Sequence, residues 1–416
     1  MKHRTDDKQV TRIAHYFRDV DFSSNSRPQF IPESFSTNCW AEDGWSARFI
    51  LRVAIRFHHI WATFGVRNGH ATIHGTQPAV CFSSFSVADL IAARDGVAGT
   101  DGVVTQYAIT FPTSSAERAG AAQVLQGGDL RALLKEGRPS GAVTQEDVWQ
   151  NQFRHVDGQL DIFGNHAPSS EWRWPYSRNY RRAIDKIERE GRLGDRLPGL
   201  DLTQKKWSGI GVVVSTQADA LRLQYDILTL IDQRFVSVDH FDHLLVCERL
   251  PASLDELSDC GLQAAISAAC FDFKSCIAVS DEAAAVAFAD FSARVSALEV
   301  SILKKETQER GGCWVYFEDN SHPYVRALMK AGRVVVNQQG RYLATLDELG
   351  RGRDLRERQE IVKVLCKQLE QEHGVACSYF SVLNSWQPDD LPSFCGRPWS
   401  GFFRVTSEPD DDDEIS

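Results

Sequence analysis

The spacing of apolar residues predicts mixed helices and short strands in the first half of the chain. Apolar residues recur at helical spacing after Ser46, whose side chain suits an N-cap, and this helix is predicted to end at Gly65. Short apolar runs between turns then predict strands at 71–75, 79–82, 107–111 and 169–176, with helices at 87–94 and within 112–150. We therefore expect an α+β domain with short strands here.

The pattern changes after a basic helix at 180–192 and a turn at 194–199. Apolar strands are predicted at 209–216, 243–250, 276–279 and 313–319, helices at 218–231, 281–305 and 322–330, and a hairpin at 333–346 with its turn around Asn337–Gly340. Alternating strands and helices are typical of a mostly parallel sheet covered by helices. The second half is therefore predicted to be an α/β domain.

These patterns give four expected regions. They are a polar N-terminal segment at 1–45, the α+β domain at 46–195, the α/β domain at 205–405 and an acidic tail at 406–416.

Composition and charge narrow the function classes. The chain has 416 residues, 43% of them hydrophobic and 25% charged, which excludes a disordered, collagenous or coiled-coil chain. Residues 1–204 carry 24 Lys/Arg and 23 Asp/Glu, whereas residues 205–416 carry 22 and 33, which accounts for the net charge of −10. The acidity therefore disfavours polyanionic partners mainly in the second half, and the near-neutral first half leaves room for a phosphate-bearing ligand.

The expected location is the cytoplasm. No apolar h-region follows the N-terminus, and no apolar run is long enough to span a membrane, so we expect no membrane partner. The ten cysteines are scattered through a chain too large to need disulfides, and none forms a C-x-x-C pair. We expect no metal cofactor. His240–His243 contains two imidazoles, but a loop between helix and strand explains this segment better than a metal site.

The most distinctive local motif is Glu171-Trp172-Arg173-Trp174. On a strand, the two Trp side chains point to one face and Glu171 and Arg173 to the other. Taken alone, such a Glu and Arg are more often a surface pair than a catalytic one.

Neighbouring segments make a catalytic interpretation stronger. The run R-N-G-H-A-T-I-H-G-T-Q-P-A-V-C-F-S-S-F-S, the strand Y-A-I-T-F and the motif S-E-W-R-W together resemble bacterial proteins related to abortive-infection (phage-resistance) families, over residues 46–176. The core of those proteins is similar to ADP-ribosyltransferases, which implies a split sheet of short strands. It also implies that NAD is consumed as a substrate, by ADP-ribose transfer or hydrolysis, in a toxin-like effector of phage defence.

This chain departs from the family pattern at Ser84 and at Ser169, and the second departure bears on the acceptor. Ser84 stands where the family usually has an acidic residue, and Ser169 stands where arginine-modifying members carry Gln or Glu. An arginine acceptor is therefore disfavoured relative to nucleic acid, another side chain or water. The acceptor macromolecule, protein or nucleic acid, stays unidentified, and homo-oligomerisation is left open.

The chemistry of NAD cleavage assigns roles to residues in these segments. Breaking the nicotinamide–ribose bond develops positive charge on the ribose, which a nearby carboxylate stabilises, and Glu171 is the candidate for this catalytic role. Ser83 or Ser84 would orient Glu171. The remaining candidates contact NAD: Gly75 and Thr76 by close backbone approach, Phe82 or Tyr107 by stacking, Arg67 and Arg173 at the pyrophosphate, and, as the resemblance implies, His74 at the adenosine ribose.

Two other interpretations stay open. The first domain could have lost its chemistry and sense a nucleotide or a phage component, or the C-terminal domain could be the enzyme. Ser215 and Thr216, and Glu318–Asn320 together with His322, follow predicted strands, where ligands gather, although we favour helix capping for Thr216 and Ser321. The motifs E-R-G-G-C-W-V-Y-F-E-D-N and Y-F-S-V-L resemble a C-terminal domain of unknown function on some of these bacterial proteins, which implies no activity.

Overall fold

The computed structural model describes residues 12–20, 45–67, 70–99, 104–136, 142–156, 171–190, 197–304 and 308–395. These residues form two compact units. The first unit holds the described residues up to Ala220 together with Asp239–Phe271, and the second holds Leu221–Val238 and the described residues from Asp272 onward. Residues 205–220 and 239–271, which the hydrophobic pattern groups with the C-terminal domain, thus lie in the first unit.

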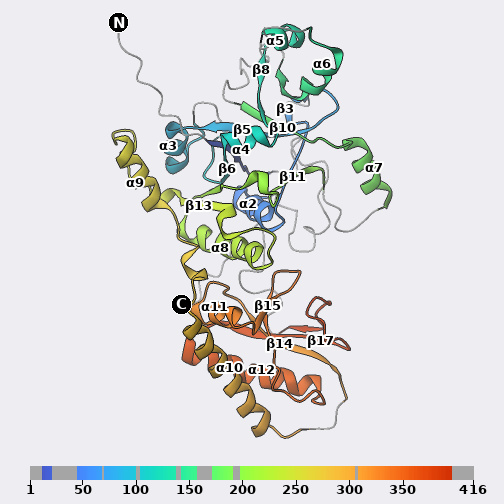
Figure 1. The fold of residues 1–416 in the computed structure, drawn as a ribbon, viewed down its shortest axis with the longest axis vertical. Helices are drawn as coiled ribbons and strands as arrows, with labels where there is room; N and C mark the ends of the chain where they lie inside the picture. Colours follow the sequence, from blue (N-terminus) through green and yellow to red (C-terminus); the bar gives the residue numbers. More distant parts are fainter. Residues whose placement is uncertain are drawn as a thin grey trace. The chain divides into compact units, whose positions relative to one another are not determined.

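A seven-stranded mixed sheet organises the first unit (Figure 1). In spatial order its strands are β13 (Phe241–Val246), β12 (Ile210–Val214), β6 (Ala108–Pro112), β1 (Arg12–Tyr16), β5 (Ala79–Phe85), β10 (Glu171–Pro175) and β7 (Ala122–Gln123). The pair β12–β13 is parallel, and the other neighbours are antiparallel. The strands predicted at 79–82, 107–111, 169–176, 209–216 and 243–250 are confirmed, with small shifts in their ends.

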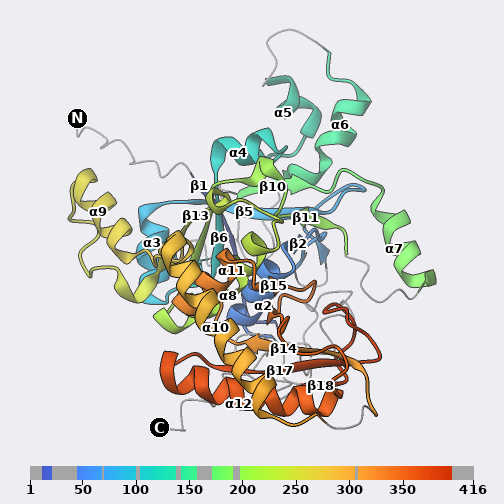
Figure 2. The ribbon, with the colours of Figure 1, turned by 60° about the horizontal axis from the view of Figure 1, so that its bottom comes forward.

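Side chains alternate between the two faces of this sheet. Ala14, Phe85, Ala108 and Val213 pack on one face with residues of α3 (Val87–Asp95) and α9 (Asp259–Ala269), which lie beside the β13 end of the sheet in Figure 2. We call this the helix-covered face. On the opposite face, the aromatic face, Phe82, Phe111, Trp174 and Trp207 form edge-to-face or tilted ring pairs.

The remaining elements of the first unit are short. They are α2 (Ala47–Arg56), α4 (Thr113–Arg118), α5 (Leu130–Glu136), α6 (Gln145–Asn151), η1 (Gln152–Arg154), α7 (Tyr180–Glu190), η2 (Lys205–Trp207), η3 (Val238–His240, whose first residue belongs to the second unit), η4 (Cys247–Arg249) and the strand pairs β2 (His59–Trp61) with β11 (Gly199–Asp201), β3 (Val66–Arg67) with β4 (His70–Ala71), and β8 (Leu125–Gln126) with β9 (His155–Val156).

The helix predicted to run from 46 to Gly65 is shorter in the structure. Ser46 caps it as expected, because its side chain accepts a hydrogen bond from Phe49 N. The helix ends at Arg56, since His58 adopts a positive φ of 45° and the following residues pair as β2 with β11. A strand at 71–75 is also wrong, because β4 covers only His70–Ala71 and a loop follows.

The sheet of the second unit is antiparallel, which corrects the prediction of a mostly parallel sheet. Its five strands lie in the order β15 (Val334–Val336), β16 (Tyr342–Ala344), β14 (Gly311–Phe317), β17 (Cys377–Leu383) and β18 (Phe394–Cys395), and every neighbouring pair is antiparallel. β14 and β15 do run in the same direction and flank a crossover helix. They are not neighbours, because β16 returns through a hairpin and inserts between them.

Helices cover one face of this sheet. Cys313, Val315 and Phe317 of β14 pack against residues of α10 (Asp281–Ser301), α11 (Pro323–Lys330) and α12 (Leu355–His373), and α10 and α12 lie beside β14 in Figure 1. Trp314 and Tyr316 point to the opposite face and pack with Leu343, Phe380 and Val382. The predicted strand at 276–279 is wrong, because this segment contains the short helix η5 (Ser275–Ile277).

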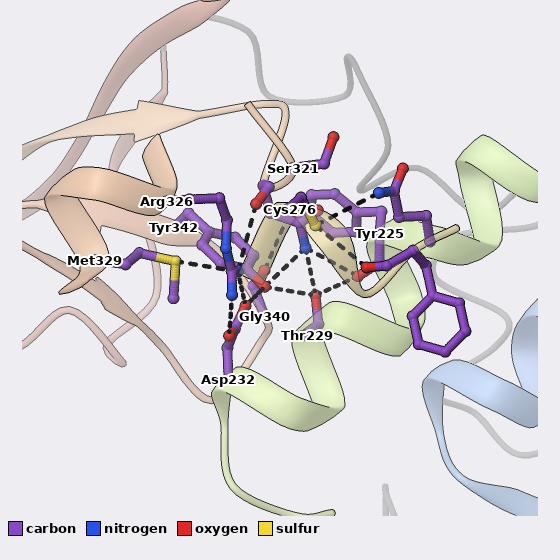
Figure 3. Close-up of polar contacts among 12 residues, drawn as sticks. Tyr225, Thr229, Asp232, Cys276, Ser321, Arg326, Met329, Gly340 and Tyr342 are labelled. Atoms are coloured by element: carbon purple, nitrogen blue, oxygen red, sulfur yellow. Dashed lines mark hydrogen bonds and ion pairs between the residues drawn. The ribbon is translucent and has the colours of Figure 1, made fainter. Parts of the chain in front are cut away.

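Within the second unit, a buried polar cluster connects residues of α8 (Gln217–Asp232) to β16 and α11 (Figure 3). Arg326 donates to both carboxylate oxygens of Asp232, at 2.6 and 3.1 Å, and Tyr342 Oη donates to Asp232 Oδ2 at 2.7 Å. Asn320 Nδ2 donates to Tyr342 Oη at 2.7 Å and to the carbonyl of Tyr225 at 3.0 Å. The charges are thus buried together with the donors that compensate them.

No helix within the described residues combines the length and the apolar character needed to cross a bilayer.

Candidate functional site

The catalytic candidates Glu171 and Ser83 are direct neighbours on adjacent strands. β10 pairs with β5 so that Glu171 lies opposite Ser83 and Arg173 lies opposite Cys81. All four side chains belong to the helix-covered face of the sheet, because residues two apart on a strand share a face. The prediction that Glu171 and Arg173 lie on the opposite face from Trp172 and Trp174 is therefore confirmed.

Glu171 and Arg173 form a buried ion pair. Arg173 Nε donates to Glu171 Oε1 at 2.7 Å, and the side chains are 3% exposed for Arg173 and 15% exposed for Glu171. Arg173 Nη1 also donates to the carbonyl of Phe153 at 2.9 Å. Burying a guanidinium is costly unless its donors are paired, so these contacts hold both side chains in one geometry. A surface pair, the ordinary interpretation of such a motif, does not describe them.

Cys81 completes this cluster. Burial, together with the negative charge of Glu171, raises the pKa of the Cys81 thiol to about 12. The thiol therefore keeps its proton at neutral pH, which makes it a poor nucleophile. Cys81 was not among the residues predicted from the sequence, although its place in the same strand as Ser83 is a usable signal.

The loop containing His74, Gly75 and Thr76 packs against η1. Gly75 has a φ of 89°, and a Cβ there would come within 2.9 Å of the Gln152 side chain. The ring of His74 lies 6.5 Å from that of His155, and all three loop residues are exposed. Since η1 also supplies the carbonyl that Arg173 contacts, the loop and the Glu171 cluster belong to one neighbourhood.

Three other predicted residues lie away from Glu171. Phe82 is 2% exposed within the ring cluster of the aromatic face, so it is not available to stack on a ligand beside Glu171. Ser84 points to that face too and accepts a hydrogen bond from Trp172 Nε1 at 3.3 Å. Tyr107 precedes β6, which β1 and β5 separate from β10, and its hydroxyl donates to Asp219 at 3.1 Å.

Arg67 is placed only by its backbone. It pairs with His70 in the two-stranded β3–β4 sheet. Ser169, which bears on the acceptor, lies outside the described residues.

A pocket of about 390 Å³ opens in the first unit, beside Trp174 of the aromatic face. Its lining comprises His59, Trp174, Tyr176, Ser177, Arg178, Leu197, Pro198, Gly199, Asp201, Gln204 and Lys206. Lys206 Nζ lies 5.7 Å from the centroid of the Trp174 ring and 5.9 Å from that of Trp207. The sequence signal for this pocket is the excess of basic residues between Glu171 and Lys206, ten against six acidic ones, although it does not show which of them converge.

The polar residues after other strands have structural contacts. Thr216 forms a capping box with Asp219, as favoured, with Oγ1 donating to Asp219 at 2.8 Å and accepting from its N–H at 3.2 Å. Ser321 is not the cap of α11, because His322 Nδ1 accepts from Tyr324 N while Ser321 bonds Asp319. Among the described residues no group of three or more His, Cys, Asp or Glu side chains is placed to hold a metal ion.

Comparison with known proteins gives one finding. The model of a family described as "Protein of unknown function (DUF4427)" matches residues 281–399, which is less than a third of the chain and lies in the second unit. No curated protein and no solved structure matches the chain. The C-terminal segment is therefore similar to a family whose description carries no activity.

Proposed function

We propose that the chain is an NAD-dependent ADP-ribosyltransferase or NAD glycohydrolase, acting as a toxin-like effector in bacterial anti-phage defence, with Glu171 as its catalytic carboxylate. The observation that carries the proposal is the pairing of Glu171 with Ser83 on one face of adjacent strands, inside the segment that resembles ADP-ribosyltransferases.

Arg173 supports this role as a positioning residue. Its bond to Oε1 fixes one oxygen of Glu171, and its second bond, to the carbonyl of Phe153, fixes the guanidinium itself. A preorganised carboxylate stabilises developing positive charge without reorganising during the reaction. A carboxylate held in this way is suited to the ribose of NAD.

The reaction breaks the bond between ribose C1′ and the nicotinamide nitrogen. Nicotinamide leaves with the electron pair of that bond, and Glu171 stabilises the positive charge that develops on the ribose. Water or an acceptor nucleophile then bonds to C1′ and releases a proton. With water the products are ADP-ribose and nicotinamide, and with an acceptor they are ADP-ribosylated acceptor and nicotinamide.

The test measures nicotinamide release and transfer of labelled ADP-ribose in the presence of host lysate. We expect Glu171→Gln to lower both by roughly 10²–10³-fold, the usual cost of removing a charge-stabilising group. Glu117→Gln, on the exposed surface of α4, is the matched control and should behave as wild type. Absence of both activities from the wild-type protein, or equal activity in Glu171→Gln, contradicts the proposal.

A second candidate is a binding protein that senses a nucleotide or phage component without turnover. Two observations favour this candidate. The Glu171 carboxylate is already bonded to Arg173, and Phe82 and Tyr107 lie away from Glu171. NAD would then raise the melting temperature while nicotinamide release stays at background. Turnover that depends on Glu171 excludes this candidate.

A further inference from the structure

The pocket beside Trp174 has a lining that fits one class of small ligand. At about 390 Å³ it falls near the small end of the range of about 300–1,000 Å³ for ligand pockets. Trp174 points to the opposite face of β10 from Glu171, since the two are three residues apart on one strand. The pocket is thus distinct from the catalytic site proposed above, and an inference about it stands independently of that proposal.

Two cations face this pocket. Lys206 and Arg178 line it, and within the described part of the chain neither forms an ion pair. Lys206 instead lies over the ring of Trp174 at 5.7 Å, a cation–π arrangement that leaves its ammonium facing a solvent-accessible space. Two cations without a carboxylate partner favour an anion such as a phosphate.

Aromatic side chains border the same space. Trp174 is almost fully buried and held by a hydrogen bond from its Nε1 to the carbonyl of Ala119, whereas Tyr176 is half-buried. The ring of Tyr176 also lies 6.5 Å from that of Tyr180, at the start of α7. A flat ring system is the natural partner for an aromatic wall of this kind.

Asp201 favours a ligand that carries hydrogen-bond donors over a bare polyanion. Its described contacts, with His58 and with the backbone and hydroxyl of Thr203, all use Oδ1. Burial acts to raise the pKa of Asp201, but the hydrogen bonds from His58 and Thr203 outweigh it and lower that pKa well below its ordinary value. The carboxylate therefore stays ionised and repels anions that bring no donor, while it accepts hydroxyl or amino groups of a suitable ligand.

We propose that this pocket binds the nucleoside monophosphate group, free or at the end of a nucleic-acid strand. Lys206 and Arg178 bind the phosphate, Trp174 and Tyr176 border the base, and Asp201 accepts hydrogen bonds from ribose hydroxyls or a base amino group. Gln204, exposed at the rim, adds a donor and an acceptor.

Calorimetric titration of the full chain tests the proposal. The probes are the four ribonucleoside 5′-monophosphates, the matching nucleosides and inorganic phosphate. We expect at least one monophosphate to bind more tightly than its nucleoside and than phosphate. Lys206→Ala and Arg178→Ala should each weaken that binding by roughly tenfold, because each removes a charge-assisted contact.

Lys205→Ala is the matched control, because Lys205 is the exposed neighbour of Lys206 and does not line the pocket. It should bind as wild type, and so should Glu171→Gln, which keeps this result separate from the catalytic proposal. Melting temperatures of all variants verify that they are folded. A 5′-phosphorylated trinucleotide that displaces the monophosphate identifies a strand end as a source, and failure to displace identifies the free nucleotide.

Three results overturn the proposal. They are no monophosphate binding to the wild type at millimolar concentration, inorganic phosphate binding as tightly as every monophosphate, and equal affinities in folded Lys206→Ala, Arg178→Ala and Lys205→Ala proteins.

Discussion

The two units each contain a buried ion pair, and the pairs differ in how completely they are enclosed. In the second unit both oxygens of Asp232 accept from Arg326, and Tyr342 adds a third bond, with both charged side chains at most 7% exposed. In the first unit Arg173 contacts Glu171 through Oε1, and the Glu171 side chain is 15% exposed.

This difference distinguishes the pair in the second unit from the pair at the proposed catalytic site. The Asp232 pair connects α8 to β16 and α11, and its oxygens are all engaged by the fold. The Glu171 pair is anchored from the Arg173 side, and the Glu171 side chain is partly exposed. Burial of charge alone therefore does not identify a site, and the partial exposure of Glu171 agrees with the role proposed for it.

The largest expected effect comes from breaking the enclosed pair. Arg326→Ala leaves the Asp232 carboxylate buried without its cation and should lower the free energy of unfolding by about 3–5 kcal/mol. Denaturant unfolding followed by circular dichroism measures this. The control Arg351→Ala, on the exposed surface, should stay within about 0.5 kcal/mol of wild type.

The double variant Asp232→Leu/Arg326→Met sharpens the result, since it removes both charges. It should recover part of the loss. If Arg326→Ala costs no more than the Arg351 control, the enclosed pair does not stabilise the fold.

A smaller effect is expected from the hydroxyl that supports this pair. Tyr342→Phe removes a donor to the Asp232 carboxylate and should cost about 2 kcal/mol, because hydrogen bonds to charged groups are worth more than neutral ones. Tyr225→Phe removes a bond to the neutral carbonyl of Gly340 and should cost about 1 kcal/mol. The reverse order in equilibrium unfolding contradicts this account of the cluster.

Glu171→Gln should separate stability from activity. The amide keeps an acceptor for Arg173 but not the charge, and the site is partly exposed, so we expect a loss of about 1–2 kcal/mol, below that of Arg326→Ala. The activity loss given above should accompany a protein that remains folded at assay temperature. If Glu171→Gln loses as much stability as Arg326→Ala, the Glu171–Arg173 pair serves to stabilise the fold instead.

A third carboxylate, Asp290, is more exposed than either and extends the comparison to pH. Burial acts to raise its pKa, but hydrogen bonds from Arg294 and Tyr324, together with the positive charge of Arg294, lower it to about 2. Because the folded-state pKa is the lower one, the ionised form stabilises the fold above pH 4, and this stability disappears as the pH falls from about 4 to 2.

The matching variant is Asp290→Asn. After allowance for solvent screening, the free energy of unfolding of wild type should exceed that of Asp290→Asn by about 1 kcal/mol at neutral pH. The two values should converge near pH 2. A difference that does not change with pH shows that the carboxylate charge contributes nothing.

Local patterns predicted the strands that carry the candidate site, but not what covers them. The alternation in Glu171–Trp174 and the apolar run from Ala79 correctly predicted two strands, and the alternation also predicted that Glu171 and Arg173 share one face. The partner of Arg173 is a backbone carbonyl of Phe153, and no side-chain pattern marks such a contact. Phe82 was predicted from the sequence to stack on the ligand, and only its ring partners reveal that it belongs to the core.

The topology of the second unit could also be predicted only in part, but there the reason is different. The strand at 313–319, the crossover helix and the hairpin around Asn337–Gly340 are all present, and Gly340 N donates to Asn337 O in the turn. Hydrophobic periodicity does not show which strand of the sheet a hairpin strand pairs with. Tyr342 and its neighbours face β14 on one side and β15 on the other, which makes the sheet antiparallel.

The position of β16 also determines when strand β14 gains its partners during translation. Central strand β14 has its two partners in later segments, β16 at Tyr342–Ala344 and β17 at Cys377–Leu383. Until the ribosome has released residue 344, both edges of β14 lack a partner, and the second edge waits for about forty residues more. A nascent chain that pauses in this interval exposes the ladder groups of a seven-residue apolar strand, the kind of edge that chaperones must shield from aggregation.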